Sequence, residues 1–198
     1  MIQKIVDALV NKQSQNYAMT DEDEKVYRYG YILLCEVILN FVIALIVGIV
    51  FSKIKMVFFF LGVYIPLRSF CGGWHADKIW KCTIISNVIL LLQVYGLENL
   101  INHLSIRMML LIFFLNMICI FLIAPVETGM KKINYEEKLT YRRKIKLILA
   151  LHLIVMLIIL LVDINEYMFS MMFVYLIQTI MLMLEIVKQR LNEKVNST

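Results

Sequence analysis

The stretch IRMMLLIFFLNMICIFLIA, residues 106–124, carries one charged side chain and ends directly before Pro125. A helix that crosses a bilayer needs roughly 20 predominantly apolar residues, and this run approaches that length. Five more apolar runs flank it, at Tyr31–Phe51, Met56–Leu67, Thr83–Gly96, Leu147–Val162 and Tyr167–Leu184. The sequence therefore predicts an all-α polytopic membrane protein with about six transmembrane or partly re-entrant helices.

Composition supports the same class. Of 198 residues, 61% are hydrophobic and only 18% are charged, whereas soluble domains are about 45–50% apolar. A soluble enzyme and a disordered chain are both excluded. We expect one integral-membrane domain over residues 1–198. The net charge of +5 would suit nucleic acid in a soluble protein, but basic cytoplasmic loops explain it here, so no nucleic-acid partner is expected.

The four cysteines suggest neither a disulfide framework nor a metal site. Cys35 and Cys119 lie inside apolar runs, where a thiol behaves as a small hydrophobe. The chain has no CxxC pair and no Cys/His cluster with zinc spacing. We therefore expect no metal and no other cofactor.

Residues 1–28 lack the continuous apolar core of a cleavable signal peptide. Their apolar residues recur at helical spacing, at Ile2, Ile5, Val6, Leu9 and Val10. This pattern fits an amphipathic cytoplasmic segment lying on the membrane surface or, equally, a packed first helix. Thr20, followed by four acidic residues, is a signal for the start of a helix.

The basic residues predict the orientation. If all six runs cross, 17 of the 20 Lys and Arg residues lie on the side that holds both termini, residues 68–82 and the loop 125–146. The positive-inside rule then predicts a multi-pass cell-membrane protein with both termini cytoplasmic. The runs 56–67 and 83–96 are short, so they are thin spans, re-entrant segments or buried core helices. A re-entrant hairpin would move residues 68–82 but not the termini.

Residues 68–82, RSFCGGWHADKIWKC, differ from the rest of the chain. This segment holds a Gly-Gly pair, one of three His and both Trp, and it lies between the two short runs. Polar, glycine-containing backbone at membrane depth is tolerated where protein or a water-filled cavity surrounds it. Ionisable groups there are functional candidates.

Cys82 and His75 can act as a nucleophile and its base, because imidazole can take the thiol proton and leave the reactive thiolate. On one straight helix, seven residues would separate them by about 10.5 Å along the axis, whereas a hydrogen bond needs roughly 3 Å. We therefore expect Gly72 and Gly73 to start a turn that carries His75. We expect Cys82 near the start of the third apolar helix, whose N-terminus stabilises a thiolate.

Residue types alone also fit simple packing roles for this Cys and His. Cys71, four residues before His75, is a rival nucleophile, although the intervening glycines disfavour a helical contact. His103 and His152 are expected to be structural.

Three further side chains have two interpretations each. Arg68 could bind a peptide carboxylate or anchor the end of a span. Asp77 could orient an imidazole or merely solvate its segment, and Glu127 could do the same from the other loop. A small transporter or channel with a re-entrant polar loop, or a non-catalytic scaffold or sensor, remains an alternative to an enzyme.

The pattern Arg68-x-x-x-Gly72-Gly73-x-His75-Ala76, followed by Cys82, resembles the accessory gene regulator B (AgrB) family of membrane cysteine endopeptidases in Gram-positive quorum sensing. A second stretch, residues 124–128 with Lys131-Lys132-Ile133 after it, resembles the segment that opens the family's large cytoplasmic loop. Met130 and Lys132 stand where the family more often has Asn and Pro, so the details of this loop carry over poorly.

The resemblance implies an activity. AgrB proteins cut a short AgrD precursor peptide near its C-terminus, with Cys82 here as the nucleophile and His75 as the general base on the cytoplasmic side. The acyl group is then held as a thioester until an internal thiol of the precursor closes a thiolactone ring. The resemblance also implies a homodimer in contact with membrane lipid. We expect supporting or substrate-binding roles for Arg68, Gly72, Gly73, Asp77, Glu127, Lys131 and Lys132.

The basic cluster between residues 131 and 146 also has two interpretations. It could attract the acidic precursor tail or the anionic lipid surface. It could equally be the ordinary positive-inside signal.

Overall fold

The computed structural model describes residues 6–8, 10, 20–74, 79–127 and 134–196, and most of them are helical. The elements are α2 (Asp21–Val50), α3 (Ile54–Cys71), α4 (Ile79–Asn99), the 3-10 helix η1 (Ile101–His103), α5 (Ile106–Ile123), α6 (Tyr135–Val162) and α7 (Asn165–Asn196). The described ranges contain no strand, apart from an isolated bridge between Gly72 and Val126. Six helices are long and apolar enough to cross a membrane, so the predicted all-α polytopic class is confirmed.

The start of α2 follows the sequence signal at Thr20. The Thr20 hydroxyl accepts a bond from the Asp23 N–H at 3.2 Å, and the Asp23 carboxylate accepts one from the Thr20 N–H at 3.1 Å. This reciprocal pair is a capping box. The hydroxyl of Thr20 also donates to the Asp23 carboxylate, which lowers the pKa of Asp23. The predicted helix start is confirmed.

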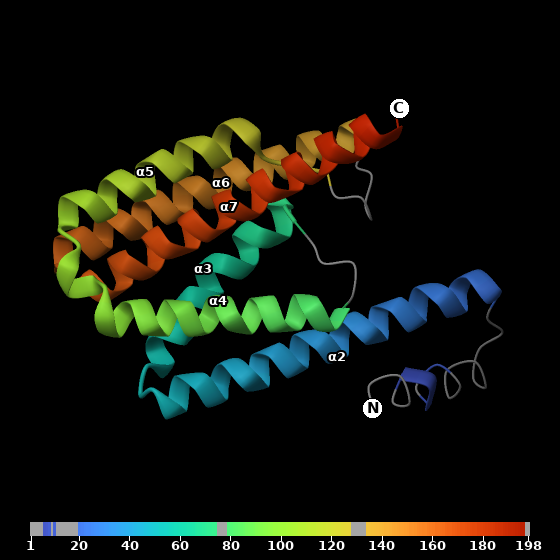
Figure 1. Ribbon diagram of the computed structural model, residues 1–198, viewed down its shortest axis with the longest axis horizontal. Coiled ribbons are helices and arrows are strands. Elements are labelled where there is room, and N and C mark those ends of the chain that lie inside the picture. Colours follow the sequence, from blue (N-terminus) through green and yellow to red (C-terminus); the bar gives the residue numbers. More distant parts are fainter. Residues whose placement is uncertain (1–5, 9, 11–19, 75–78, 128–133, 197–198) are drawn as a thin grey trace.

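The described residues near the N-terminus form a helical turn that packs against the rest of the protein. Val6 and Val10 are almost fully buried, and the Asp7 carboxylate pairs with the Arg28 guanidinium on α2. Figure 1 shows this turn beside the first part of α2. Of the two interpretations of this segment, these contacts support a packed helix.

Helices α3 and α4 are longer than the apolar runs from which they were predicted. They contain 18 and 21 residues, and each is long enough to cross. Pro66, close to the end of the predicted run 56–67, lies inside α3. A proline removes one backbone donor, and α3 retains its helical form because it packs against α2, α6 and α7.

The expected loop 125–146 is also partly helical. α6 begins at Tyr135, where the Glu137 carboxylate accepts a bond from the Asn134 N–H at 3.3 Å. Five of the seven basic residues assigned to that loop therefore lie on α6. The sequence interpretation was wrong here because it treated charge as a sign of a loop, whereas a charged first part of a long helix can extend beyond the membrane.

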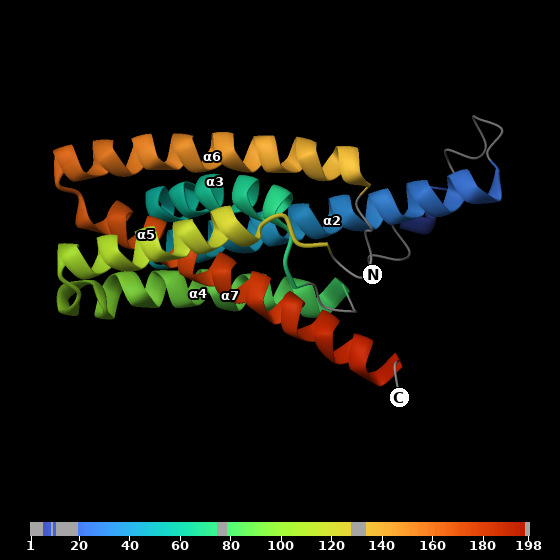
Figure 2. The ribbon, with the colours of Figure 1, turned by 90° about the horizontal axis from the view of Figure 1, so that it is seen from above.

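The helices alternate in direction along the bundle (Figures 1 and 2). One end holds the turn after α3, the segment after α5 and the C-terminal part of α7. There Gly72 bridges to Val126, whereas at the opposite end of the bundle the Lys53 ammonium pairs with the Glu166 carboxylate at 2.7 Å. α3 thus runs from one end of the bundle to the other and is long enough to cross a membrane, which favours a span over a re-entrant hairpin.

α7 lies at the centre of the packing and contacts α3, α4, α5 and α6. Its Tyr175 is fully buried, with its ring centroid 4.6 Å from that of Phe113 on α5. The Tyr175 hydroxyl lies 3.1 Å from Nδ1 of His152 on α6. His152 is therefore a buried, hydrogen-bonded core residue, as predicted, whereas His103 is exposed in η1. The central position of α7 lets it support the turn that follows α3.

Candidate active site

The turn after α3 is built on two glycines. Gly72 has φ +73° and Gly73 has φ +115°, conformations that glycine adopts without the steric cost of a Cβ. A Cβ at Gly72 would overlap the Val126 carbonyl oxygen, and one at Gly73 would lie 2.5 Å from Nη1 of Arg68. The Gly-Gly pair therefore ends α3 and permits close approach on both sides, as the sequence predicted for the start of a turn.

Arg68 holds this turn from within α3. Its Nη1 donates to the Gly72 carbonyl at 2.9 Å, and its Nη2 donates to the Trp74 carbonyl. The sequence left open whether Arg68 binds a carboxylate or anchors the end of a span. In the structure its guanidinium bonds the backbone of the turn.

Two neighbouring elements support the same turn. Gln178 on α7 donates through Nε2 to the Gly72 carbonyl at 3.0 Å, and the Trp74 N–H donates to the Met181 carbonyl at 2.9 Å. From the segment after α5, the Val126 N–H donates to the Cys71 carbonyl at 3.0 Å. Arg68 of α3, helix α7 and the segment after α5 thus hold the backbone of Cys71, Gly72 and Trp74.

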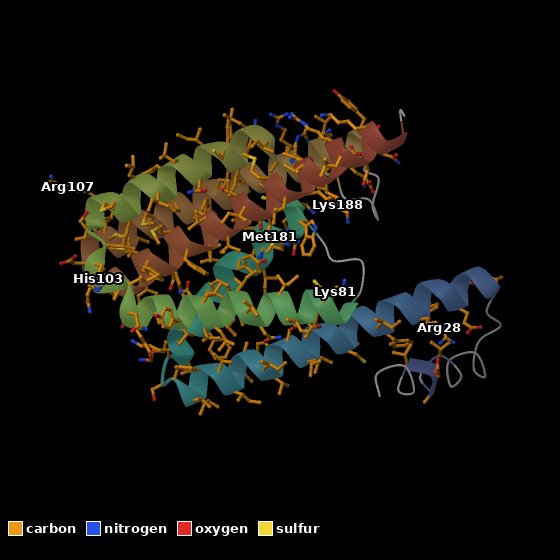
Figure 3. The ribbon with its side chains drawn as sticks, in the orientation of Figure 1. Arg28, Lys81, His103, Arg107, Met181 and Lys188 are labelled. Atoms are coloured by element: carbon orange, nitrogen blue, oxygen red, sulfur yellow. The ribbon has the colours of Figure 1, made fainter. Side chains whose placement is uncertain are left out.

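Cys82 lies in the first turn of α4, as the sequence predicted. It lines a cavity of about 140 Å³ between α3, α4 and α7, together with Tyr64, Arg68, Trp74, Ile85, Ser86, Ile89 and Met181. Figure 3 labels Lys81 and Met181 at the end of the bundle where α3 stops and α4 starts. A half-buried thiol on a cavity can meet a substrate, and backbone N–H groups at the start of a helix stabilise its thiolate.

The rival nucleophile Cys71 has a different environment. It is the last residue of α3, with no exposed surface, and it belongs to the buried hydrophobic core. It is not among the residues that line the cavity. The geometry therefore favours Cys82 as the reactive thiol.

Four of the predicted site residues, His75, Asp77, Lys131 and Lys132, lie outside the described residues. The segment 73–84 is not one continuous helix, since residues 72–74 are not helical and α4 begins at Ile79. Between His75 and Cys82, residues 79–82 are helical and residues 75–78 lie outside the described part, so the expected departure from helical form there stays a prediction. The pairing of these two side chains remains a prediction.

Glu127 is engaged away from the cavity. Its carboxylate lies 3.8 Å from the Lys138 ammonium of α6, and its carbonyl accepts a bond of 2.5 Å from Nε2 of Gln189 on α7. The structure thus links Glu127 to α6 and α7 and does not bring it to the Cys82 cavity.

Basic side chains of α6 gather at the same end of the bundle. The ammonium of Lys144 lies 4.9 Å from the ring centroid of Phe70 on α3, and that of Lys146 lies 5.8 Å from the ring centroid of Phe121 on α5. Both lysines are exposed. The basic part of α6 is therefore anchored on the helix ends beside the turn that holds Trp74.

Sequence reasoning missed Tyr64, Ser86, Gln178 and Met181. Gln178 carried a usable signal, because an amide inside an apolar run is costly at membrane depth and is expected to have a partner. Tyr64, Ser86 and Met181 carried none, since their helical positions do not reveal which neighbouring helix they face.

A family model now adds to this geometry: the accessory gene regulator B model matches residues 2–182. The chain belongs to the AgrB family. Members of this family take part in the processing of quorum-sensing peptides. The match covers the turn, Cys82 and all the residues of the cavity.

Relatives carry the same family name or a related one. The chain is 26% identical over 143 residues to an AgrB-like protein 2 of Clostridium perfringens strain 13, covering 70% of this chain and 67% of the relative. It is 30% identical over 95 residues to FsrB of Enterococcus faecalis, covering 48% and 39%. No solved structure matches. The shared name supports the family assignment and leaves the chemistry of this AgrB chain to be argued from its site.

Proposed function

We propose that this AgrB-family protein is a membrane cysteine endopeptidase that removes the C-terminal tail of an AgrD-like precursor and promotes its closure to a thiolactone. The observation that carries the proposal is the position of Cys82, at the start of α4 and on a cavity beside the Arg68-held turn. His75 follows that turn by one residue in the sequence.

Each step of the reaction uses groups of this chain. His75 takes the proton of the Cys82 thiol, and Sγ attacks the scissile carbonyl carbon. The C–N bond breaks, and protonated His75 returns the proton to the departing amine of the tail. The rest of the precursor remains on Cys82 as a thioester. An internal thiol of the precursor then loses its proton to His75 and attacks this thioester. The ring forms, the bond to Cys82 Sγ breaks, and His75 returns the proton to the departing Cys82 thiolate.

Exclusion of water decides between cyclisation and hydrolysis. Exchange of one thioester for another is nearly balanced in energy, whereas hydrolysis is strongly downhill. Most of the cavity wall is apolar, from Tyr64 and Trp74 to Ile85, Ile89 and Met181. This lining supports a site that keeps water from the acyl group.

The turn and the residues near it supply positioning. Arg68, Gly72 and Gly73 fix the backbone that leads to His75, and we assign Asp77 to orienting its imidazole. Backbone N–H groups of the turn or of the start of α4 are candidates for stabilising the oxyanion.

The basic residues near the turn after α3 suit a precursor with an acidic C-terminal tail. Lys131 and Lys132, with the basic residues of α6, would attract the tail and anionic lipid headgroups. With all six helices crossing, 17 of the 20 Lys and Arg residues lie on one side, which supports a cytoplasmic position for the site and both termini. We include residues 1–198 in one peptidase domain that works as a homodimer.

The test is reconstitution of the full chain in lipid vesicles with an AgrD-like precursor encoded next to it, followed by mass spectrometry. The expected product is a shortened peptide whose mass is one water below that of the hydrolysed form, because its acyl group has passed to the internal thiol and not to water. Cys82→Ala and His75→Ala should abolish cleavage while still inserting, and Cys71→Ala should retain it. Cleavage by Cys82→Ala, or its loss in Cys71→Ala alone, would contradict the proposal.

A further inference from the structure

The cavity beside Cys82 is large enough to hold more than a thiol. Its volume is about 140 Å³, close to the engineered apolar cavity of about 150 Å³ that binds benzene. Tyr64 contributes from α3, Trp74 from the turn and Met181 from α7. These side chains provide apolar surface next to the reactive sulfur.

Helix α4 sets the direction in which the cavity extends. Ile85 and Ile89 follow Cys82 by three and seven residues, so they share one face of the helix, and both line the cavity. Their neighbours Ile84 and Val88 lie on another face and are 52% and 47% exposed. The cavity therefore follows one face of α4 from Cys82 toward Ile89, about 10.5 Å further along the axis.

The cationic group in the cavity is already engaged. The Arg68 guanidinium donates to the carbonyls of Gly72 and Trp74. A carboxylate entering the cavity would find no second cationic side chain among the described residues that line it and would lose its hydration against a mainly apolar wall. An apolar group instead meets the isoleucines without disturbing the turn.

We propose that this cavity is the subsite for the substrate residue whose carbonyl Cys82 attacks, and that it selects a large apolar side chain such as Leu, Met or Phe. This inference rests on the proposed peptidase function. When Sγ bonds to the carbonyl carbon, the side chain of that residue is held within a few bonds of Cys82 and must occupy the adjoining space. The apolar cavity supplies that space, and filling it also displaces water from the acyl group.

The experiment varies both the substrate residue before the cut site and the residues that line the cavity. The cut site is first located by mass spectrometry with the natural precursor. The residue before it is then replaced by Ala, Leu, Phe or Asp in synthetic precursors. Full-length wild-type protein and the variants Ile89→Phe and Ile85→Ala are reconstituted in vesicles, and kcat/KM is measured for each peptide. Matched controls on the exposed face of α4 are Val88→Phe and Ile84→Ala.

The wild type should prefer Leu and Phe over Ala. One methylene in an apolar pocket typically changes kcat/KM by about 10–200-fold. Ile89→Phe should lower the Phe-to-Ala ratio by a factor in that range, and Ile85→Ala should raise the Phe-to-Leu ratio. Both controls should keep the wild-type ratios. If Ile89→Phe fails to insert, the widened Ile85→Ala cavity still provides the test.

Unchanged ratios in both cavity variants, or a wild-type preference for Asp, would overturn the subsite while leaving a Cys82-dependent peptidase in place. Equal ratio changes in the exposed-face controls would overturn it as well, because they would indicate a general effect of α4. Cleavage that persists in Cys82→Ala would overturn the peptidase proposal and the subsite with it.

Discussion

Cys71 and Cys82 lie at the same end of the bundle but in opposite environments. Cys71 ends α3 inside the hydrophobic core and has no exposed surface. Cys82 starts α4 and lines a cavity that also contains Arg68. Residue type alone does not identify a functional side chain. His152, for example, is buried and lies within hydrogen-bonding distance of Tyr175. A Cys or His becomes a candidate for chemistry here through access to a cavity, and packing makes it structural elsewhere.

The contrast between the two thiols should be largest in their reactivity. Alkylation by iodoacetamide in vesicles should modify Cys82 about 100-fold faster than Cys71, because opening a packed core costs about 3 kcal/mol and each 1.4 kcal/mol is tenfold. Peptide mapping by mass spectrometry over time gives both rates. Equal rates would remove the distinction between core and cavity.

Alanine substitutions of two glycines compare the turn after α3 with an ordinary position inside that helix. Gly72→Ala places a Cβ against the Val126 carbonyl at a positive φ, and such strain costs about 1–3 kcal/mol. Precursor cleavage should fall about 5–150-fold. Gly62→Ala on α3 is the control, since no heavy atom lies within 4 Å of its added Cβ. A Gly72→Ala protein as active as Gly62→Ala would show that the turn does not position the site.

Variants of two buried glutamines can distinguish a residue that supports the turn from one that only packs the bundle. Gln178 bonds the Gly72 carbonyl, whereas Gln93 on α4 donates to the Ser170 hydroxyl at 2.5 Å, away from the cavity residues. Loss of one hydrogen bond is worth about 0.5–1.5 kcal/mol, so Gln178→Leu should lower kcat roughly 2–10-fold with little change in KM. Gln93→Leu should alter thermal stability and not kcat. The comparison fails if both variants lower kcat equally.

The smallest effect is expected in the core. Tyr175→Phe removes the hydroxyl next to His152, and a hydrogen bond between membrane helices contributes on average about 0.6 kcal/mol. Unfolding in mixed detergent should show a destabilisation of about that size, with unchanged cleavage per folded molecule. A clear loss of cleavage at unchanged stability would assign His152 and Tyr175 to the site.

The sequence was sufficient for the class, the six helices and the start of α2, because apolar length and the Thr20 cap are local signals. It also predicted a turn starting at Gly72 and Gly73, and the position of Cys82 near the start of α4. It underestimated α3 and α4, since Pro66 and the flanking polar residues hide helical continuation that packing against other helices sustains.

The cavity required the structure. Gln178 and Met181 reach the turn from α7, and a contact between residues so distant in sequence leaves no local pattern. The burial of Cys71 likewise depends on the helices packed around it. Motif spacing alone therefore left the two thiols as alternatives, and their different exposure separates them.

The central claim is that Cys82 carries the acyl group. A precursor whose internal cysteine is replaced by alanine can be cut but cannot close its ring, so the thioester should accumulate. Acid quenching, peptide mapping and mass spectrometry of the full-length protein should find the N-terminal part of the precursor on Cys82, released by hydroxylamine. The same adduct on Cys71, or complete cleavage without any adduct on the protein, would contradict the account.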